Sequence, residues 1–286
     1  MDIGYNSEYT RLESVLLHIP IREEIIGHHP DDAMYEDKPD YDLVIGELKQ
    51  YMFTLQSLGI KVYSDIGILR KGVMAYFPNL IFMRDLAAVI PNTIILANMK
   101  YEIRRGEPYC LKDILRFHGY KDDIYELCRG TFEGADFLWR NPSTVLLSVG
   151  NRTSTEVIDS MKDILNVNNI CLEVILSDKI SIPQHILGQK HIASDDILIS
   201  RTKISNHDFG YKTVIELDET EEVVKRYAMN IVTLAPNVII MPDDCPETKK
   251  IFESYGIVCH TSPMKELRKM AGGFACMTLP LKREML

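Results

Sequence analysis

Short apolar segments recur in pairs along this chain, and a tight-turn signal separates the two members of each pair. Each turn carries Pro, Asn or Asp, which restrict φ or bond a side chain to the backbone within a sharp reversal. Paired apolar segments with such a turn between them predict β-hairpins. We expect four hairpins, at residues 81–98, 136–149, 185–200 and 231–241.

Amphipathic helical patterns follow several of these hairpins. Residues Glu156–Leu165 place apolar side chains at i, i+3 or i+4 and i+7 or i+8, with Thr155 as the expected N-cap. Residues Pro246–Tyr255 begin with proline and end before Gly256, as helices commonly do. A further helix is expected at Leu43–Leu58, which also ends before a glycine. The chain therefore repeats a ββα(β) unit about four or five times, which predicts an α/β fold.

No Ser/Gly-rich linker or low-complexity stretch divides the chain, so we expect a single domain over residues 1–286. One ββα(β) unit cannot cover its own apolar faces, which favours a closed arrangement of units around an axis. With 46% hydrophobic and 26% charged residues, the chain can bury a sizeable core. That composition excludes a wholly disordered or fibrous protein.

The net charge of −9 comes from 32 basic and 41 acidic residues spread along the chain. A protein that binds nucleic acid regardless of sequence would carry a basic excess, so we expect no nucleic-acid partner. No apolar run approaches the roughly 20 residues that span a bilayer, and no signal-peptide layout opens the chain. We therefore expect a cytoplasmic protein with no membrane partner. A homodimer is compatible with the sequence, which leaves the oligomeric state open.

The six cysteines lie far apart and form no C-x-x-C pair, so neither a structural zinc site nor a dense disulfide framework is expected. Polar clusters stand at the ends of the expected strands, where sites are usually built. Taken alone, each is compatible with a solvated ion pair, turn carboxylates, a core histidine or a buried thiol. The clusters are residues 79–85, 132–136, 184–188 and 272–278.

Together the clusters supply a cysteine, a histidine and several carboxylates, which suit attack on a cationic carbon centre. A guanidinium group presents N–H donors and a full positive charge, so carboxylates are its natural partners. A thiolate can add to its central carbon, and a histidine can protonate the departing nitrogen and then activate water. This chemistry requires no metal ion and no cofactor, and its partner is a small-molecule guanidine.

With these motifs the chain resembles the guanidine-modifying superfamily of arginine deiminases, dimethylarginine dimethylaminohydrolases and amidinotransferases. The resemblance extends from Tyr9–His18 to Cys276–Leu281. It implies a five-bladed α/β propeller of ββαβ pseudo-repeats. It also implies a cysteine-dependent hydrolase of arginine or a substituted guanidine, which releases ammonia or an alkylamine and a ureido product such as citrulline through a covalent S-alkylthiouronium intermediate. The alternatives are an amidinotransferase that passes the amidino group to an amine and a non-catalytic binding propeller.

The resemblance implies roles for particular residues. Cys276, at the end of a glycine-rich motif, matches the nucleophile, and His185 in His-Ile-Leu-Gly matches the catalytic histidine. Glu133 and Asp136 match a Glu-Gly-x-Asp motif, in which the glutamate would orient His185 and the aspartate would support the site. The remaining matches bind substrate: Asp85 for the guanidinium nitrogens, Asn79, and Arg104 and Arg152 for a substrate carboxylate.

Two of these assignments have rivals. His191 lies in the same segment as His185, although the distance to the following turn favours His185. Arg105 is as well placed in the sequence as Arg104. His191 and Arg105 therefore remain the alternatives to His185 and Arg104.

The chain also departs from the family pattern in ways that bear on the substrate. Two residues after the histidine, deiminases and amidinotransferases carry an aspartate and dimethylarginine hydrolases commonly a lysine, whereas this chain has Leu187. One carboxylate clamp is therefore absent unless another acid, such as Asp136 or Asp243, replaces it. Phe274 and Ala275 stand where deiminases often have polar or basic residues. The sequence therefore supports substituted guanidines as substrates as well as it supports arginine.

Overall fold

The computed structural model describes residues 1–65, 77–176, 189–202 and 209–286, and these residues form five three-stranded sheets. In every sheet the middle strand pairs antiparallel with one neighbour and parallel with the other. In hydrogen-bonded order, the sheets are β3 (Ala87–Ile90), β4 (Thr93–Leu96) and β5 (Ile124–Glu126); β6 (Phe137–Asn141), β7 (Thr144–Val149) and β8 (Cys171–Leu176); β9 (Lys190–Ile192), β10 (Ile197–Arg201) and β11 (Thr213–Leu217); β12 (Val232–Ala235), β13 (Val238–Pro242) and β14 (Val258–Ser262); and β15 (Leu279–Arg283), β1 (Leu12–Leu17) and β2 (Lys61–Ser64).

The hairpins predicted from the apolar pattern are confirmed as β3–β4, β6–β7, β9–β10 and β12–β13. Asn92 and Asn237, in two of the turns, adopt φ of 58° and 59°. Asparagine tolerates this left-handed conformation better than most residues, which explains its place there. Residues 185–188 of the third predicted hairpin lie outside the described residues.

The predicted strand at residues 81–85 is wrong. Met83–Leu86 forms the short 3-10 helix η2, because the N–H of Asp85 donates to the carbonyl of Phe82 at 3.1 Å and so turns the chain. The start of the second hairpin also differs, since Asp136 ends another 3-10 helix, η4 (Gly134–Asp136), one residue before β6 begins. Both turns carry candidate site residues.

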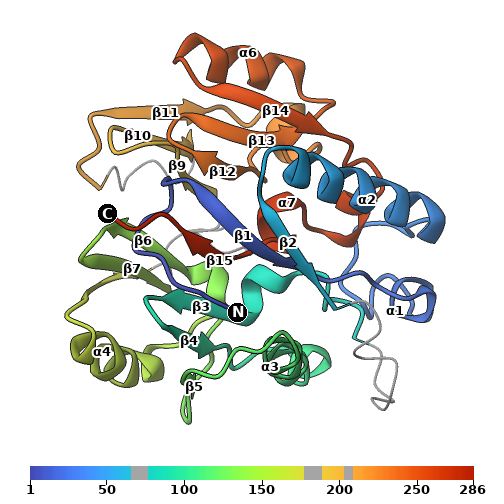
Figure 1. The fold of residues 1–286 in the computed structure, drawn as a ribbon. Coiled ribbons are helices and arrows are strands. Elements are labelled where there is room, and N and C mark those ends of the chain that lie inside the picture. The colour runs from blue at the N-terminus through green and yellow to red at the C-terminus, as the bar shows by residue number, and fades with distance from the viewer. Residues whose placement is uncertain (66–76, 177–188, 203–208) are drawn as a thin grey trace.

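The fifth sheet joins the two ends of the chain. β1 pairs antiparallel with β15, and Leu16 lies opposite Leu279. β1 also pairs parallel with β2, so this sheet repeats the topology of the other four. Figure 1 shows β1 and β15 side by side in the middle of the molecule. Because the two strands come from opposite ends of the sequence, no local hairpin signal marks this sheet.

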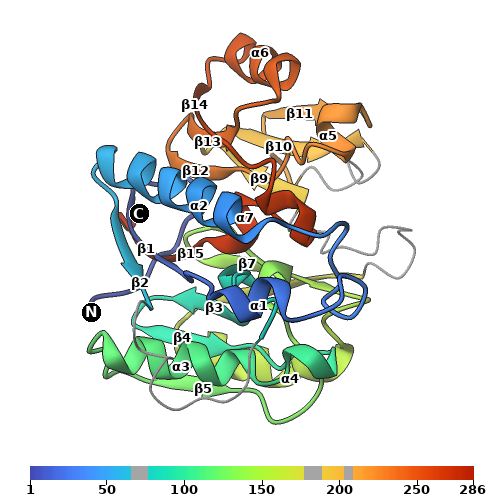
Figure 2. The ribbon, with the colours of Figure 1, turned by 90° about the vertical axis from the view of Figure 1, so that its right-hand side faces the viewer.

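Helices follow the middle strand in four of the sheets and lie at the periphery in Figures 1 and 2. These four are α2 (Tyr41–Ser57), α3 (Glu107–Phe117), α4 (Ile158–Val167) and α6 (Pro246–Ser254). The shorter helices are α1 (Arg22–Ile26), α5 (Glu221–Val224), α7 (Phe274–Met277), η3 (Glu102–Arg104), η5 (Thr155–Val157) and η8 (Leu267–Met270).

The helix predictions are confirmed with shifted ends. α2 begins two residues before the predicted Leu43, because the Asp40 side chain accepts hydrogen bonds from the second and third N–H groups of the helix. Thr155 is not an N-cap: it opens η5, a 3-10 turn that leads into α4. α6 ends at Ser254, and Gly256 follows with φ of 78°. This left-handed conformation suits glycine after a helix end.

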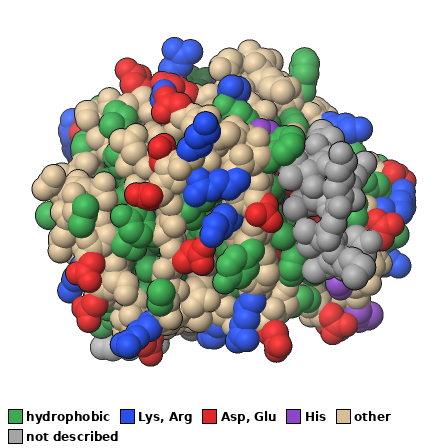
Figure 3. Space-filling model, turned by 60° about the horizontal axis from the view of Figure 1, so that its bottom comes forward, with side chains coloured by type: hydrophobic (Ala, Val, Ile, Leu, Met, Phe, Trp, Pro, Cys, Tyr) green, Lys and Arg blue, Asp and Glu red, His purple; other side chains and the backbone are tan. Residues whose placement is uncertain are grey.

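Buried apolar side chains from the strands and from the inner faces of the helices form the hydrophobic core. The face shown in Figure 3 carries acidic and basic side chains interspersed with apolar ones. Among the described residues, no helix combines the length and the apolar character that a bilayer crossing requires.

Candidate active site

Two short turns bring the acidic residues of the site together. η2 carries Asp85, and Glu133 immediately precedes η4. A Cβ atom on Gly134 would lie 2.1 Å from the carbonyl oxygen of Ala87 and 2.5 Å from that of Arg84. Only glycine therefore allows the two turns to approach so closely, which gives a physical reason for the glycine in the Glu-Gly-x-Asp motif.

A buried guanidinium group connects the carboxylates. Nη1 of Arg104 lies 2.8 Å from Asp85 and 3.9 Å from Glu133, and its Nε donates to Glu107 at 2.9 Å. Burial lowers the pKa of Arg104, but the three carboxylates outweigh burial and raise it, so this guanidinium stays charged. Burial raises the pKa of Glu107 to about 7, although Arg104 opposes that shift.

Of the two rival arginines, the structure brings Arg104 to the carboxylates, whereas Arg105 is exposed. Sequence reasoning missed Glu107, which is wholly buried. The Arg-x-x-Glu spacing, from the last residue of η3 to the first of α3, is a signal that could have indicated it, because residues three apart in helical segments are neighbours.

A second arginine, Arg152, contacts Glu133. Nη1 of Arg152 contacts both carboxylate oxygens of Glu133, at 3.2 and 3.3 Å, and its guanidinium group lies 4.5 Å from the ring centre of Tyr101. Asp136 accepts hydrogen bonds from Ser148 at 2.6 Å and Thr153 at 2.7 Å. The hydroxyl donors hold the Asp136 carboxylate in one orientation.

Cys276 lies in the single-turn helix α7, after two glycines. Its Sγ accepts a hydrogen bond from Nδ2 of Asn230 at 3.2 Å. In the same helix, Phe274 stacks on Tyr51 with ring centres 4.3 Å apart, and this packing anchors α7 against α2. Sequence reasoning missed Asn230, and no local motif marks it because it lies 46 residues from Cys276.

The larger of two cavities that Cys276 lines, of about 280 Å³, collects most of the predicted site residues. Glu133 and Asp136 are buried beside it, in contact with the lining residue Arg152 and its neighbour Thr153. His185 and Leu187 lie outside the described residues. The predicted residues that line the cavity are Asn79, Asp85, Arg104, Arg152 and Cys276.

The larger cavity also holds an acid that sequence reasoning missed. Glu36 lines it and accepts a hydrogen bond from the hydroxyl of Tyr227. Asp243, considered as a substitute for the carboxylate absent at Leu187, is exposed and is not part of the described lining of this cavity. Asp136, the other acid considered for that role, accepts hydrogen bonds from the hydroxyl groups of Ser148 and Thr153.

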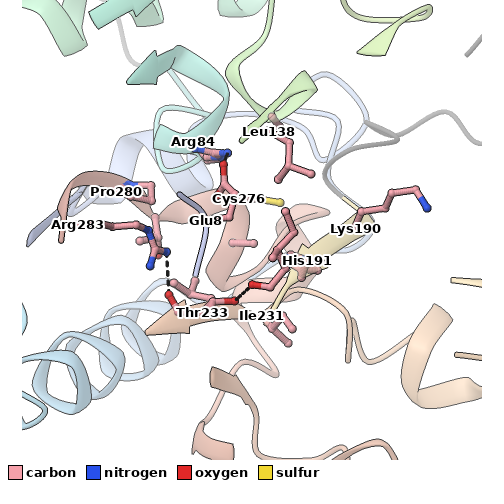
Figure 4. Close-up of a pocket in the computed structure, with 15 residues that line it drawn as sticks. Glu8, Arg84, Leu138, Lys190, His191, Ile231, Thr233, Cys276, Pro280 and Arg283 are labelled. Atoms are coloured by element: carbon pink, nitrogen blue, oxygen red, sulfur yellow. Dashed lines mark hydrogen bonds and ion pairs between the residues drawn. The ribbon is translucent and has the colours of Figure 1, made fainter. Parts of the chain in front are cut away.

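A smaller cavity, of about 70 Å³, lies on another side of Cys276 (Figure 4). Figure 4 shows the Cys276 sulfur at its edge, near Leu138 and His191. Burial lowers the pKa of His191 to about 4, so this histidine is uncharged at neutral pH. Cys276 lines both cavities and therefore stands at the boundary between them.

Within the described part of the chain, no group of three or more His, Cys, Asp or Glu side chains is arranged to hold a metal ion. All six cysteines are free thiols. The described groups that offer chemistry at the two cavities are a thiol, carboxyl groups, guanidinium groups, the imidazole of His191 and the amine of Lys190.

Comparison with known families extends these observations. A family model described as arginine deiminase matches residues 43–186 and 210–283. An arginine deiminase from Borreliella afzelii is 23% identical over 85% of this chain and 68% of its own length. A dimethylarginine dimethylaminohydrolase from Pseudomonas aeruginosa is 26% identical over 85% of this chain and 90% of its own length.

Solved structures share the fold. The dimethylarginine dimethylaminohydrolase of Pseudomonas aeruginosa, in complex with citrulline, superposes with a TM-score of 0.72 at 21% identity, covering 94% of this chain and 99% of that one. An amidinotransferase of saxitoxin biosynthesis from Microseira wollei superposes with a TM-score of 0.76 at 16% identity, covering 99% of this chain and 97% of that one.

Proposed function

This chain belongs to the arginine deiminase family, and from that premise we propose that it is a cysteine-dependent hydrolase of arginine or of a substituted arginine. The products are ammonia or an alkylamine and a ureido compound such as citrulline. The observation that carries the proposal is the larger cavity, where Cys276 shares one lining with Asp85 and Arg152.

The charge around the cavity suits a guanidinium substrate. Asp85, Glu107, Glu133 and Asp136 contribute four buried carboxyl groups and Glu36 a fifth, exposed one, against the guanidinium groups of Arg104, Arg152 and Arg201. Even with Glu107 protonated, the carboxylates outnumber the arginines. An excess of negative charge in a partly desolvated cavity favours a cation and stabilises the positive charge of the reacting carbon.

The proposed reaction divides one substitution into two steps. The Cys276 thiolate adds to the guanidinium carbon to form a C–S bond, and the C–N bond breaks as His185 donates a proton to the departing nitrogen. The S-alkylthiouronium group then remains on Cys276. His185 takes a proton from water, the water oxygen attacks the same carbon, and the C–S bond breaks to return the thiolate and release the ureido product.

The assignment of the acid–base role to His185 rests on its motif and on the properties of its rival. With a pKa lowered by burial to about 4, His191 is a neutral imidazole at neutral pH, and its remaining N–H is too weak an acid to protonate a leaving nitrogen efficiently. An efficient general acid has a pKa near the working pH. This contrast favours His185.

We also propose that residues 1–286 form one domain, in which the five sheets close into a five-bladed α/β propeller of ββαβ units. The identical strand order of the five sheets supports this arrangement. The pairing of β1 with β15 supports it further, because a strand from each chain end completes the fifth unit.

The test is mass spectrometry of the enzyme quenched during turnover with arginine, methylarginine, dimethylarginine and agmatine, alongside assays for ureido products. A mass increment on the Cys276 peptide together with a ureido product supports the hydrolase and identifies its substrate. An increment that yields ureido product only slowly, and disappears when glycine, lysine or ornithine is added, supports amidino transfer. The absence of an increment with every guanidine contradicts the proposal.

Replacement of Arg152 by methionine is expected to separate substrates by their carboxylate. Arg152 lines the cavity, and loss of a charge-assisted hydrogen bond costs about 1.5–3 kcal/mol, which predicts a roughly 10- to 100-fold fall in kcat/KM for arginine. Agmatine lacks the carboxylate, so its kcat/KM falls less, and the ratio of the two values measures carboxylate recognition. The matched control is Arg105→Met, which removes an exposed guanidinium. Equal losses of kcat/KM for both substrates would show that Arg152 acts through its contact with Glu133 and does not bind the substrate carboxylate.

A further inference from the structure

Both ends of the Asn230 side-chain amide contact the segment that carries Cys276. Its Oδ1 accepts hydrogen bonds from the backbone N–H groups of Ala275, at 2.7 Å, and Cys276, at 3.3 Å. Its Nδ2 donates to Cys276 Sγ at 3.2 Å. Backbone N–H groups can only donate, so they fix the position of Oδ1 and leave the amide nitrogen facing the sulfur.

The surroundings hold Asn230 in this position. The residue is 6% exposed and lies two residues before Val232, where β12 begins. Its backbone N–H donates to the carbonyl of Tyr227 at 2.7 Å, and Tyr227 adopts φ of 58°. A bulky residue adopts this left-handed conformation only where the surrounding structure enforces it, so the turn that presents Asn230 is constrained.

The glycine before α7 makes the contact possible. A Cβ atom on Gly273 would lie 2.9 Å from Cγ of Asn230 and 2.6 Å from Sδ of the buried Met264. Any side chain there would push the amide away from α7 or displace the core residue beneath it. The second glycine of the Gly-Gly motif therefore serves the approach of Asn230.

We propose that Asn230 is a positioning residue that holds Cys276 as a thiolate at the boundary of the two cavities, an inference that rests on the nucleophilic role proposed for Cys276. A thiolate accepts hydrogen bonds far better than a thiol, so an N–H donor at the sulfur favours the charged, nucleophilic form. The same side chain binds two N–H groups of the helix α7 and so prevents rotation of the segment that carries the sulfur.

Substitution Asn230→Asp tests the two halves of the amide separately. Aspartate keeps an oxygen for the two backbone N–H groups but replaces the N–H donor at the sulfur with a second carboxylate oxygen. The pH profile of Cys276 alkylation by iodoacetamide is expected to move upward by one pH unit or more, which slows alkylation about tenfold at neutral pH. Because Cys128 and Cys171 are exposed and also react, the rate is followed on the Cys276 peptide by mass spectrometry.

Two further variants make the outcome decisive. Asn168→Asp makes the same charge change at the end of α4, far from Cys276 in the fold, and is expected to leave the alkylation profile unchanged. Asn230→Ala removes both the acceptor and the donor without adding charge, and is expected to shift the profile in the same direction by less. An alkylation profile equal to that of the parent in a folded Asn230→Asp protein overturns the inference. If that variant does not fold, a parental profile in Asn230→Ala overturns it.

This experiment is independent of the substrate. Iodoacetamide reacts with a thiolate whether or not the protein hydrolyses a guanidine, so failure of the proposed function leaves the alkylation result interpretable. Conversely, a parental alkylation profile in the Asn230 variants refutes the role of Asn230 while the hydrolase proposal stands on its own test.

Discussion

Replacement of Cys276 by alanine or serine is expected to lower turnover of the guanidine substrate by more than about 1,000-fold, because the reaction loses its covalent nucleophile. Serine preserves the shape of the side chain, but its hydroxyl is protonated at neutral pH and is a poor nucleophile. Substrate binding is expected to remain nearly intact, because the groups proposed to bind it, Asp85 and Arg152, are unchanged.

The measurement combines turnover assays with calorimetric titration of substrate into the inactive variant. Cys259→Ser is the matched control, since Cys259 is partly exposed like Cys276, yet burial raises its pKa to about 11 and keeps its thiol protonated. We expect this control to retain parental turnover. Substantial turnover by Cys276→Ser would refute the covalent scheme.

The second large effect is expected on stability, at a buried ion network away from the cavities. His18 is buried between two carboxylates: its Nδ1 contacts Asp65, and its Nε2 lies 3.0 Å from Glu24. Asp65 also accepts the N–H of Ile19, and Glu24 that of Ile21. The network thus ties the ends of β1 and β2 to α1.

Burial lowers the pKa of His18, but the charges and hydrogen bonds of Asp65 and Glu24 outweigh burial and raise that pKa to about 10. The folded state therefore binds a proton that the unfolded state releases near its ordinary pKa of about 6.5. The stabilisation is complete below that pH and is lost as pH rises through 10. We expect the free energy of unfolding to fall steadily between these limits.

Substitution His18→Leu leaves both carboxylates buried without their counter-ion, and such a loss costs about 3–5 kcal/mol. Urea unfolding at pH 6.5 and pH 9.5 is expected to show the larger loss at pH 6.5, where the parent histidine is fully charged. His29→Gln is the control, because His29 is exposed and its imidazole lies 3.6 Å from the carboxylate of Asp31 at the protein surface. A loss that is equal at both pH values would show that the imidazole is uncharged in the folded protein.

Local patterns predicted much of the fold because they depend on neighbours in the sequence. The hairpins around Asn92 and Asn237 and the helix that begins at Pro246 follow from turn and capping preferences that act within a few residues. The pairing of β1 with β15 could not be predicted in this way, since it joins segments at opposite ends of the chain. The strand expected at residues 81–85 is wrong because a 3-10 turn buries apolar side chains, such as that of Met83, as a strand does.

The order of residues along the chain specifies which chemical groups are available: one cysteine after paired glycines, a Glu-Gly-x-Asp turn, and a repeated α/β unit that presents them at strand ends. Which of these groups meet depends on the three-dimensional fold. It placed Arg104 and not Arg105 against Asp85, and it brought Asn230 to the sulfur of Cys276. The physical reason is that hydrogen bonds and ion pairs act over a few ångströms in space, whereas sequence patterns record only distances along the chain.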